Sequence, residues 1–269
     1  MKKTSLILSA IALIFATSCK NDTKKEEKKT ETEMTSTSEE AQEITLTKLK
    51  GSPEFADASL KLKSPMETKQ SKKELQFDFE VENYELGVQT ESEQPNMLAS
   101  SDKGQHIHFI LDNEPYSAHY ESKFSKTLEQ GDHVMIAFLS RSYHEAVKNE
   151  NSYVVKKFSV GEPTKDQMME VDFEAPHMFY SRPKGTYKGE DTQKVMLDFF
   201  LVNTDLAADA NKVRATINGQ EFMLDDWVPY VMEGLPMGEN TVEIELLDAD
   251  GKFIDGPFNK TTRTFMLEK

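Results

Sequence analysis

The sequence predicts an all-β protein, because its short apolar segments alternate with polar residues at period two and are bounded by Gly, Pro, Asn and Asp. This pattern runs through two successive stretches of similar length, which follow an apolar and then a charged N-terminal region. Few segments have the longer period that an amphipathic helix requires. Together these observations favour two tandem immunoglobulin-like β-sandwich domains after a signal peptide and a disordered tether.

The first 18 residues have the pattern of a bacterial export signal. Lys2 and Lys3 precede the apolar run LILSAIALIF, which is too short to span a bilayer as a helix. The run leads into ATSC, which ends at Cys19 and resembles a lipobox, where a lipoprotein signal is removed and the new N-terminal cysteine carries lipid. We predict a signal peptide over residues 1–18 and lipidation of Cys19, with a plain secretory signal as the alternative.

The segment 19–52 is rich in Lys, Glu, Thr and Ser, and such a composition predicts a disordered tether. Cys19 is the only cysteine, which excludes an internal disulfide, thiol catalysis and a cysteine-based zinc site. The net charge of −15 disfavours nucleic acid as a partner. We expect the lipid to attach the protein to the outer membrane of a Gram-negative envelope, and the charged residues after Cys19 suggest that it faces the cell surface.

An internal repeat divides the rest of the chain. The segments ELQFDFEVENYEL (74–86) and KVMLDFFLVNTDL (194–206) align, and landmarks before and after them follow in the same order. We assign copy one to residues 53–162 and copy two to residues 168–269, with an extra stretch at 87–105 in copy one. The identical pairs in the two segments are Asp78/Asp198, Phe79/Phe199, Asn83/Asn203 and Leu86/Leu206.

Five strands are expected in each copy, and a single helical turn at 225–232. The expected strands of copy one are 58–63, 75–82, 106–112, 133–140 and 153–160, and those of copy two are 169–174, 194–202, 212–217, 240–247 and 261–267.

Two of the strands of copy one have unusual outward faces. In GQHIHFILDNEPY (104–116), His106 and His108 occupy positions where copy two has Lys212 and Arg214, so both histidines are predicted on the exposed side of their sheet. The outward positions of strand 133–140 are apolar, whereas those of the aligned strand 240–247 in copy two are polar. The reverse holds for strand 194–202 of copy two, whose outward positions are apolar where the aligned strand 75–82 of copy one is polar. We therefore predict that the sandwiches pack on each other through these faces. The apolar positions are Val134, Ile136 and Phe138 in copy one, and Met196, Phe200 and Val202 in copy two.

Two hypotheses follow for a site. Imidazoles on one face suit copper or zinc, so His106 and His108 are candidate metal ligands, with His119, His133, His144 or Met97 as the third. Ordinary surface histidines near a domain contact are the alternative. A second hypothesis rests on FYSRPKGTY (179–187) and LSRSYH (139–144), whose arginines beside aromatic residues suggest a loop that recognises phosphate or carboxylate. The alternative is that these arginines bind no ligand and form ion pairs with nearby acidic residues.

The quoted segments also resemble a family of bacterial lipoproteins named phosphopeptide-binding proteins, over nearly everything after the tether. The resemblance implies recognition of a phosphorylated or other anionic peptide, and Arg141, His144, Arg182 and Lys184 are the residues on which it would rest. The segments that carry it are GQHIHFILDNEPY, FLSRSYHE, FYSRPKGTY, KVMLDF and EGLPMGENT.

The sequence contains no GxSxG elbow, HExxH motif or Gly-rich phosphate loop. We therefore expect a non-catalytic, lipid-anchored binding module that needs no cofactor, with copper or zinc binding as the alternative function.

Overall fold

The computed structural model describes residues 43–269. The predicted signal peptide, Cys19 and the predicted tether as far as residue 42 lie outside the described residues. The prediction of a disordered tether is wrong at its end, because Thr45–Lys48 form strand β1 and pair antiparallel with β15 (Tyr230–Glu233). Ile44 and Leu46, two residues apart, pack into an apolar core, and this burial orders the segment.

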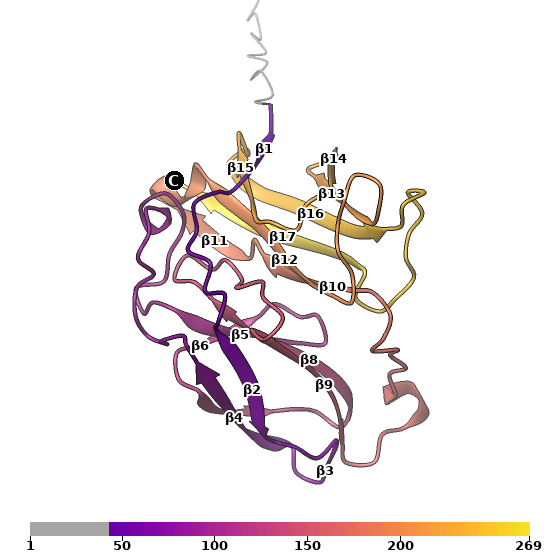
Figure 1. Cartoon of the computed structure of the whole chain (residues 1–269). Coiled ribbons are helices and arrows are strands. Elements are labelled where there is room, and N and C mark those ends of the chain that lie inside the picture. The colour runs from indigo at the N-terminus through magenta and orange to yellow at the C-terminus, as the bar shows by residue number, and fades with distance from the viewer. Residues whose placement is uncertain (1–42) are drawn as a thin grey trace, which may run out of the picture. The chain divides into compact units, whose positions relative to one another are not determined.

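The first half of the described chain forms a three-stranded sheet, in the order β2-β4-β7, and a five-stranded sheet, in the order β3-β9-β8-β5-β6 (Figure 1). The five strands expected in copy one are confirmed within two residues at their ends, whereas the short β3, β6 and β7 were not expected. The strands are β2 Ser59–Ser64, β3 Lys69–Gln70, β4 Glu74–Glu82, β5 His106–Leu111, β6 Ser117–His119, β7 Lys123–Thr127, β8 Gly131–Ser140 and β9 Tyr153–Val160.

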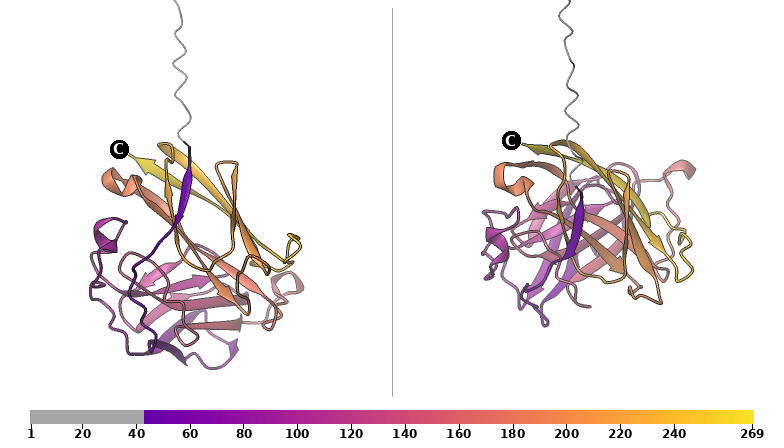
Figure 2. Two further views of the ribbon diagram at one scale, coloured as in Figure 1. Left: turned by 45° about the horizontal axis from the view of Figure 1, so that its top comes forward. Right: turned by 90° about the horizontal axis from the view of Figure 1, so that it is seen from above.

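The second half forms a four-stranded sheet, in the order β1-β15-β12-β10, and a five-stranded sheet, in the order β11-β17-β16-β13-β14. The views in Figure 2 show β1, at the indigo start of the described chain, beside the orange and yellow strands of this half. The remaining strands are β10 His177–Arg182, β11 Gly185–Lys188, β12 Val195–Val202, β13 Lys212–Ile217, β14 Gln220–Leu224, β16 Gly238–Leu247 and β17 Lys260–Glu268.

The two halves have the same topology, as the repeat predicted. β10, β12 and β15 correspond to β2, β4 and β7, the two five-stranded sheets have the same order, and β1 is an addition. In each half the first strand of the repeat, β2 or β10, shifts register shortly before a proline, Pro65 or Pro183. The strand that follows then joins the five-stranded sheet by parallel pairing, β3 with β9 and β11 with β17. Asn83 and Asn203, identical in the repeat, both have a left-handed backbone, with φ of 55° and 56°.

Two predicted elements of copy two are wrong. Residues 169–174 form no strand, and the chain begins its sheet at β10 instead. The expected helical turn at 225–232 is replaced by β15, because Tyr230 and Met232 alternate at period two and both enter the core of this half. Short 3-10 helices connect strands at Gln94–Asn96, Lys165–Gln167 and Gly189–Thr192. Within residues 43–269, no helix has the length and apolar character needed to cross a bilayer.

Each half encloses its own apolar core between its two sheets. Phe77 of β4 meets Phe109 of β5 edge to face in the first half, with ring centroids 4.8 Å apart. Phe199 of β12 and Ile244 of β16 occupy the corresponding core of the second half. These are sandwiches of the predicted immunoglobulin-like kind.

A third core joins the two halves. Phe138 of β8 stacks on Phe200 of β12, with centroids 4.7 Å apart and an interplanar angle of 23°. Both rings are fully buried, so the predicted packing of the two apolar outer faces is confirmed. The other fully buried members of this core are Ile110, Val134, Ile136 and Phe179.

Candidate metal centre

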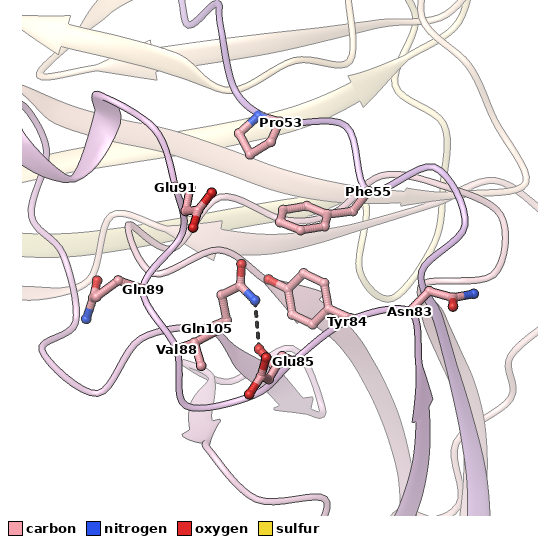
Figure 3. Close-up of a pocket in the computed structure, with 9 residues that line it drawn as sticks. All are labelled: Pro53, Phe55, Asn83, Tyr84, Glu85, Val88, Gln89, Glu91 and Gln105. Atoms are coloured by element: carbon pink, nitrogen blue, oxygen red, sulfur yellow. Dashed lines mark hydrogen bonds between the residues drawn. The ribbon is translucent and has the colours of Figure 1, made fainter.

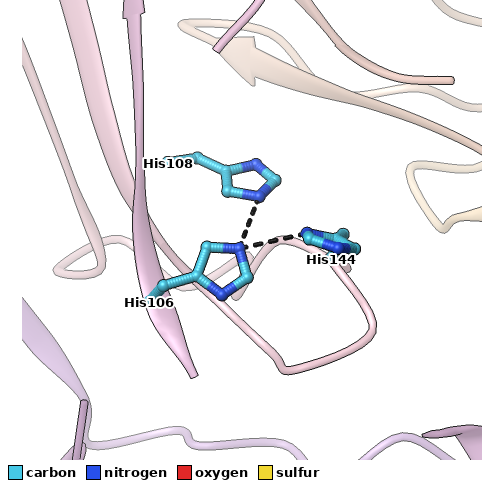
Figure 4. Close-up of side chains that lie close together, drawn as sticks. All are labelled: His106, His108 and His144. Carbon is cyan, nitrogen blue, oxygen red and sulfur yellow. Dashed lines mark hydrogen bonds between the residues drawn. The ribbon is translucent and has the colours of Figure 1, made fainter. Parts of the chain in front are cut away.

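Three imidazoles converge where β5 begins (Figure 4). His106 Nε2 lies 2.9 Å from His108 Nε2 and 3.1 Å from His144 Nδ1. The three nitrogens that could act as ligands all lie within 4.8 Å of one another. The cluster thus offers three nitrogen donors to a single point.

The two histidines of β5 lie on the face that the repeat predicted, but they are not exposed. Ile107 and Phe109 point into the core of the first half, and His106 and His108 point the opposite way. Both histidines are 0 % exposed, so the prediction of an exposed position is wrong. The physical reason is the packing of the second half on this face, where Ser181 of β10 lies 3.3 Å from His108 Nδ1.

His144 reaches the cluster from the loop between β8 and β9. Its backbone is left-handed, with φ of 69°, a conformation that few residues other than glycine adopt. A tight turn fixes it, because the His144 N–H donates to the Arg141 carbonyl at 2.9 Å and the Arg141 N–H donates to the Glu145 carbonyl at 2.9 Å.

Backbone contacts set the tautomer of His106. Its Nδ1 lies 2.8 Å from the Gly104 carbonyl, which can only accept, so Nδ1 carries the proton and the Nε2 lone pair points into the cluster. This is the arrangement in which metal-binding histidines are commonly held. Gly104 has φ of +82°, and a Cβ there would lie 2.3 Å from the Val88 carbonyl oxygen. The close approach of the two chain segments therefore requires glycine.

The stretch 87–105, present only in copy one, supports the cluster from outside. The Ser142 N–H donates to Thr90 Oγ1 at 3.0 Å, and the Ser101 N–H donates to the Ser142 carbonyl at 2.8 Å, so the stretch holds the loop that carries His144. Ser101 Oγ also lies 2.7 Å from the hydroxyl of Tyr120, whose ring packs on His106 at 5.1 Å between centroids.

The surroundings keep the three imidazoles neutral. Burial lowers the pKa of His106 to about 4. Burial also lowers the pKa of His108 and that of His144 well below the usual range, and the neighbouring cations Arg182 and Lys184 lower them further. At neutral pH all three rings can therefore act as ligands without losing a proton.

Of the residues predicted for a metal site, His106 and His108 come together and the third member is His144. His119 Nε2 lies 2.9 Å from Ser117 Oγ, and its ring stacks on Phe124 with centroids 3.4 Å apart. His133 Nδ1 lies 2.6 Å from the Asp112 carboxylate. Neither His119 nor His133 belongs to the cluster. The side chain of Met97 is 46 % exposed, whereas His106 and His108 are fully buried, so Met97 does not share their environment.

The cations predicted to bind an anion are engaged within the protein. Arg182 Nη1 donates to the Tyr116 hydroxyl at 2.8 Å, and Lys184 Nζ donates to the Tyr116 carbonyl at 2.6 Å. Arg141 donates to the carbonyl oxygens of Pro53 and Ala146 and pairs with Glu145 at 3.3 Å.

The prediction that the segment 179–187 is a loop is wrong. Its first four residues end β10, and its last three belong to β11. The residues Phe179 to Arg182 are buried, because β10 lies in the sheet that faces the first half.

Tyr116 is the residue that sequence reasoning missed. Its ring stacks on His108 at 3.6 Å between centroids with an angle of 14°, and its hydroxyl lies 3.2 Å from His144 Nδ1. A signal was present, since copy one has a tyrosine where the aligned position of copy two is Phe222. Only the hydroxyl distinguishes these two side chains.

A separate open cleft of about 730 Å³ lies beside the stretch 87–105 (Figure 3). Phe55 and Tyr84 meet edge to face on one side of it, with centroids 4.8 Å apart, and Glu85 and Gln105 lie near its floor, where Gln105 Nε2 donates to the Glu85 carbonyl at 2.7 Å. The three histidines of the cluster do not line this cleft.

Comparison with known proteins gives similarity of fold only. No family model matches the chain, and no curated protein matches it. Among solved structures, it is similar to fibronectin(III)-like modules of Clostridium thermocellum CbhA, at 10% identity and a TM-score of 0.27, covering 78% of this chain and 94% of that chain.

Two further structures have the same kind of similarity. One is a Bacteroides ovatus protein, SGBP-B of a mixed-linkage glucan utilization locus, at 9% identity and a TM-score of 0.24, covering 78% of this chain and 70% of that chain. The other is the neural ectodermal development factor IMP-L2, at 10% identity and a TM-score of 0.23, covering 78% of this chain and 94% of that chain.

Proposed function

We propose that this protein is a non-catalytic binding module that holds one copper or zinc ion at His106, His108 and His144. The observation that carries the proposal is the convergence of three neutral imidazole nitrogens, 2.9 and 3.1 Å apart along the two shorter edges. Imidazole is a preferred ligand of both ions. Three protein ligands also leave a further coordination position free.

The spacing of the nitrogens supports a bound ion. Metal–nitrogen bonds of about 2.0–2.1 Å in a tetrahedron place neighbouring nitrogens about 3.3 Å apart. The two separations from His106, 2.9 and 3.1 Å, differ from this by a few tenths of an ångström. The nitrogens of His108 and His144 lie within 4.8 Å of each other, so the rings of these two residues would rotate toward the ion when it binds. The His106 Nε2 lone pair already points into the cluster, because Nδ1 donates to Gly104.

We further propose that Cys19 carries lipid and attaches the protein to the outer membrane of a Gram-negative bacterium, facing the surface. The support is the N-terminal sequence, with its short apolar run ending in ATSC. A single acyl chain gives marginal attachment, and the several chains of a bacterial lipoprotein give a stable one.

Recognition of a phosphorylated peptide has less support from the geometry. Arg141, Arg182 and Lys184 donate to groups of the protein itself, and the guanidinium of Arg182 is buried. A phosphate at these side chains would have to displace those contacts.

The test is a metal titration of the purified protein after treatment with a chelator. Thermal unfolding is followed with Zn²⁺ or Cu²⁺ added, and metal at 100 times its dissociation constant should raise the stability by about 2.7 kcal/mol. His144→Asn should abolish the effect, because asparagine accepts the left-handed backbone but lacks the imidazole. His119→Gln is the matched control and should keep it. No effect on the parent protein, or an equal effect on His144→Asn, would reject the proposal.

A further inference from the structure

Tyr116 stands beside the histidine cluster in the position of a fourth ligand. Its hydroxyl lies 3.2 Å from His144 Nδ1, a separation close to the 3.1 Å between the His106 and His144 nitrogens. Its ring stacks on His108, and the side chain is 3 % exposed. The hydroxyl therefore lies against the His144 side of the cluster and is shielded from water.

Two cations are directed at this tyrosine from the second half of the chain. Arg182 Nη1 donates to the hydroxyl at 2.8 Å, and Lys184 Nζ lies 3.8 Å from the centroid of the ring. The hydrogen bonds of these two side chains go to Tyr116, and among residues 43–269 neither side chain forms an ion pair with a carboxylate. A buried guanidinium without a counter-anion is unfavourable, so the site is built to receive negative charge.

We propose that the phenolate oxygen of Tyr116 is the fourth ligand of the metal ion held by His106, His108 and His144. This inference rests on the proposed function. When the ion enters, the hydroxyl proton leaves to the solvent buffer and an electron pair of the oxygen forms the bond to the metal. No oxidant or reductant is required.

The phenolate accounts for an otherwise unfavourable distribution of charge. A divalent ion among three neutral imidazoles would add to the repulsion from Arg182 and Lys184. A phenolate between the ion and Arg182 attracts both, and the Arg182 hydrogen bond becomes charge-assisted. The aligned Phe222 of copy two lacks this oxygen, as the aligned Lys212 and Arg214 lack the imidazoles.

The test uses Cu²⁺ as the probe, because a phenolate bound to Cu²⁺ gives a charge-transfer absorption in the visible range. Protein with Cys19→Ser, which removes the thiol, is titrated with Cu²⁺ alone at neutral pH. We expect the band together with resonance-enhanced vibrations of a phenolate ring. Tyr116→Phe should still bind Cu²⁺ through the histidines but lose the band. Tyr120→Phe, a neighbouring tyrosine against His106, is the control and should keep it.

The outcomes separate the two proposals. If the parent protein takes up no Cu²⁺, the proposed function is wrong. If it takes up Cu²⁺ without phenolate vibrations, or if the band survives in Tyr116→Phe, the assignment of Tyr116 is wrong. Uptake without the band that strengthens on adding inorganic phosphate would assign the position to a solute anion instead. Should Tyr116→Phe fail to fold, the vibrations of the parent and of Tyr120→Phe still decide between the tyrosines.

Discussion

Lys148 Nζ lies 2.5 Å from a carboxylate oxygen of Asp198, and this ion pair joins the two halves of the chain. Asp198 is 0 % exposed, and its other oxygen accepts the Ala146 N–H at 2.9 Å. Asp78, its counterpart in the repeat, pairs instead with Lys123 near the surface. The same position of the repeat thus forms an ion pair between the halves at Asp198 and an ion pair within one sheet at Asp78.

Asp198→Asn should destabilise the protein by about 3–5 kcal/mol, because it leaves the partly buried Lys148 without its counter-charge. Asp78→Asn removes a pair exposed to water and should cost less than about 1 kcal/mol. Urea denaturation of both variants measures the difference. Equal losses of stability in the two variants would show that the ion pair between the halves stabilises the protein no more than the exposed one.

The stacked pair of Phe138 and Phe200 allows a direct test of the packing between the halves. Each truncation to alanine should cost about 3–5 kcal/mol, since both rings are fully buried. The double variant should show a coupling energy of about 0.5–1.5 kcal/mol. Phe77 lies in the core of the first half, so a cycle between Phe77→Ala and Phe200→Ala should be additive within about 0.5 kcal/mol. If the Phe138/Phe200 cycle were as additive as the Phe77/Phe200 cycle, the packing of Phe138 on Phe200 would be contradicted.

The repeat made much of the fold predictable, because comparing the two copies reveals which positions are unusual. Phe138 and Phe200 are apolar where the aligned positions are acidic, so burial against each other could be inferred from the sequence. The first strand of copy two could not be inferred. The apolar residues of 169–174 fit a strand equally well, and only the pairing of β10 with β12 decides between them.

The candidate site was predictable only in part. The sheet face of His106 and His108 followed from Lys212 and Arg214, but their burial depends on what covers that face, which no periodicity reveals. His144 joins them through a left-handed turn, and Tyr116 through a loop. Such convergence depends on tertiary packing, which local sequence patterns do not reveal.

Acid should destabilise the metal-free protein. The pKa of His106 is about 4 in the folded chain and about 6.5 when unfolded, because burial opposes its charge. Between these values the unfolded chain binds a proton that the folded chain does not, so the stabilisation is complete above pH 6.5 and is lost as the pH falls. Each such histidine contributes a slope of up to about 1.4 kcal/mol per pH unit. Urea denaturation from pH 7.5 to pH 5 measures it.

Two variants separate the sources of this pH dependence. His144→Asn should reduce the acid slope, since the pKa of His144 is also lowered by burial. His133→Gln should steepen it, because the hydrogen bond to Asp112 raises the pKa of His133, and the stability gained there is present below pH 6.5 and lost as the pH rises. A stability that is flat from pH 7.5 to pH 5 in all three proteins would contradict the neutral, buried state of the cluster.

Gly104 provides the last test, because the proposed centre depends on the backbone that it allows. Gly104→Ala places a Cβ 2.3 Å from the Val88 carbonyl oxygen, so the start of β5 must move and with it the Gly104 carbonyl that orients His106.

Gly87 is the matched control, since its φ of +80° is nearly the same as the +82° of Gly104 but nothing lies within 4 Å of its Cβ position. Gly87→Ala should cost only the backbone strain, about 1–2 kcal/mol, and leave metal affinity unchanged. Gly104→Ala should cost more and weaken Zn²⁺ binding by about 10–100-fold, the usual effect of removing a partner that orients a ligand. Calorimetric titration with Zn²⁺ compares them, and equal affinities would mean that the Gly104 carbonyl does not position His106.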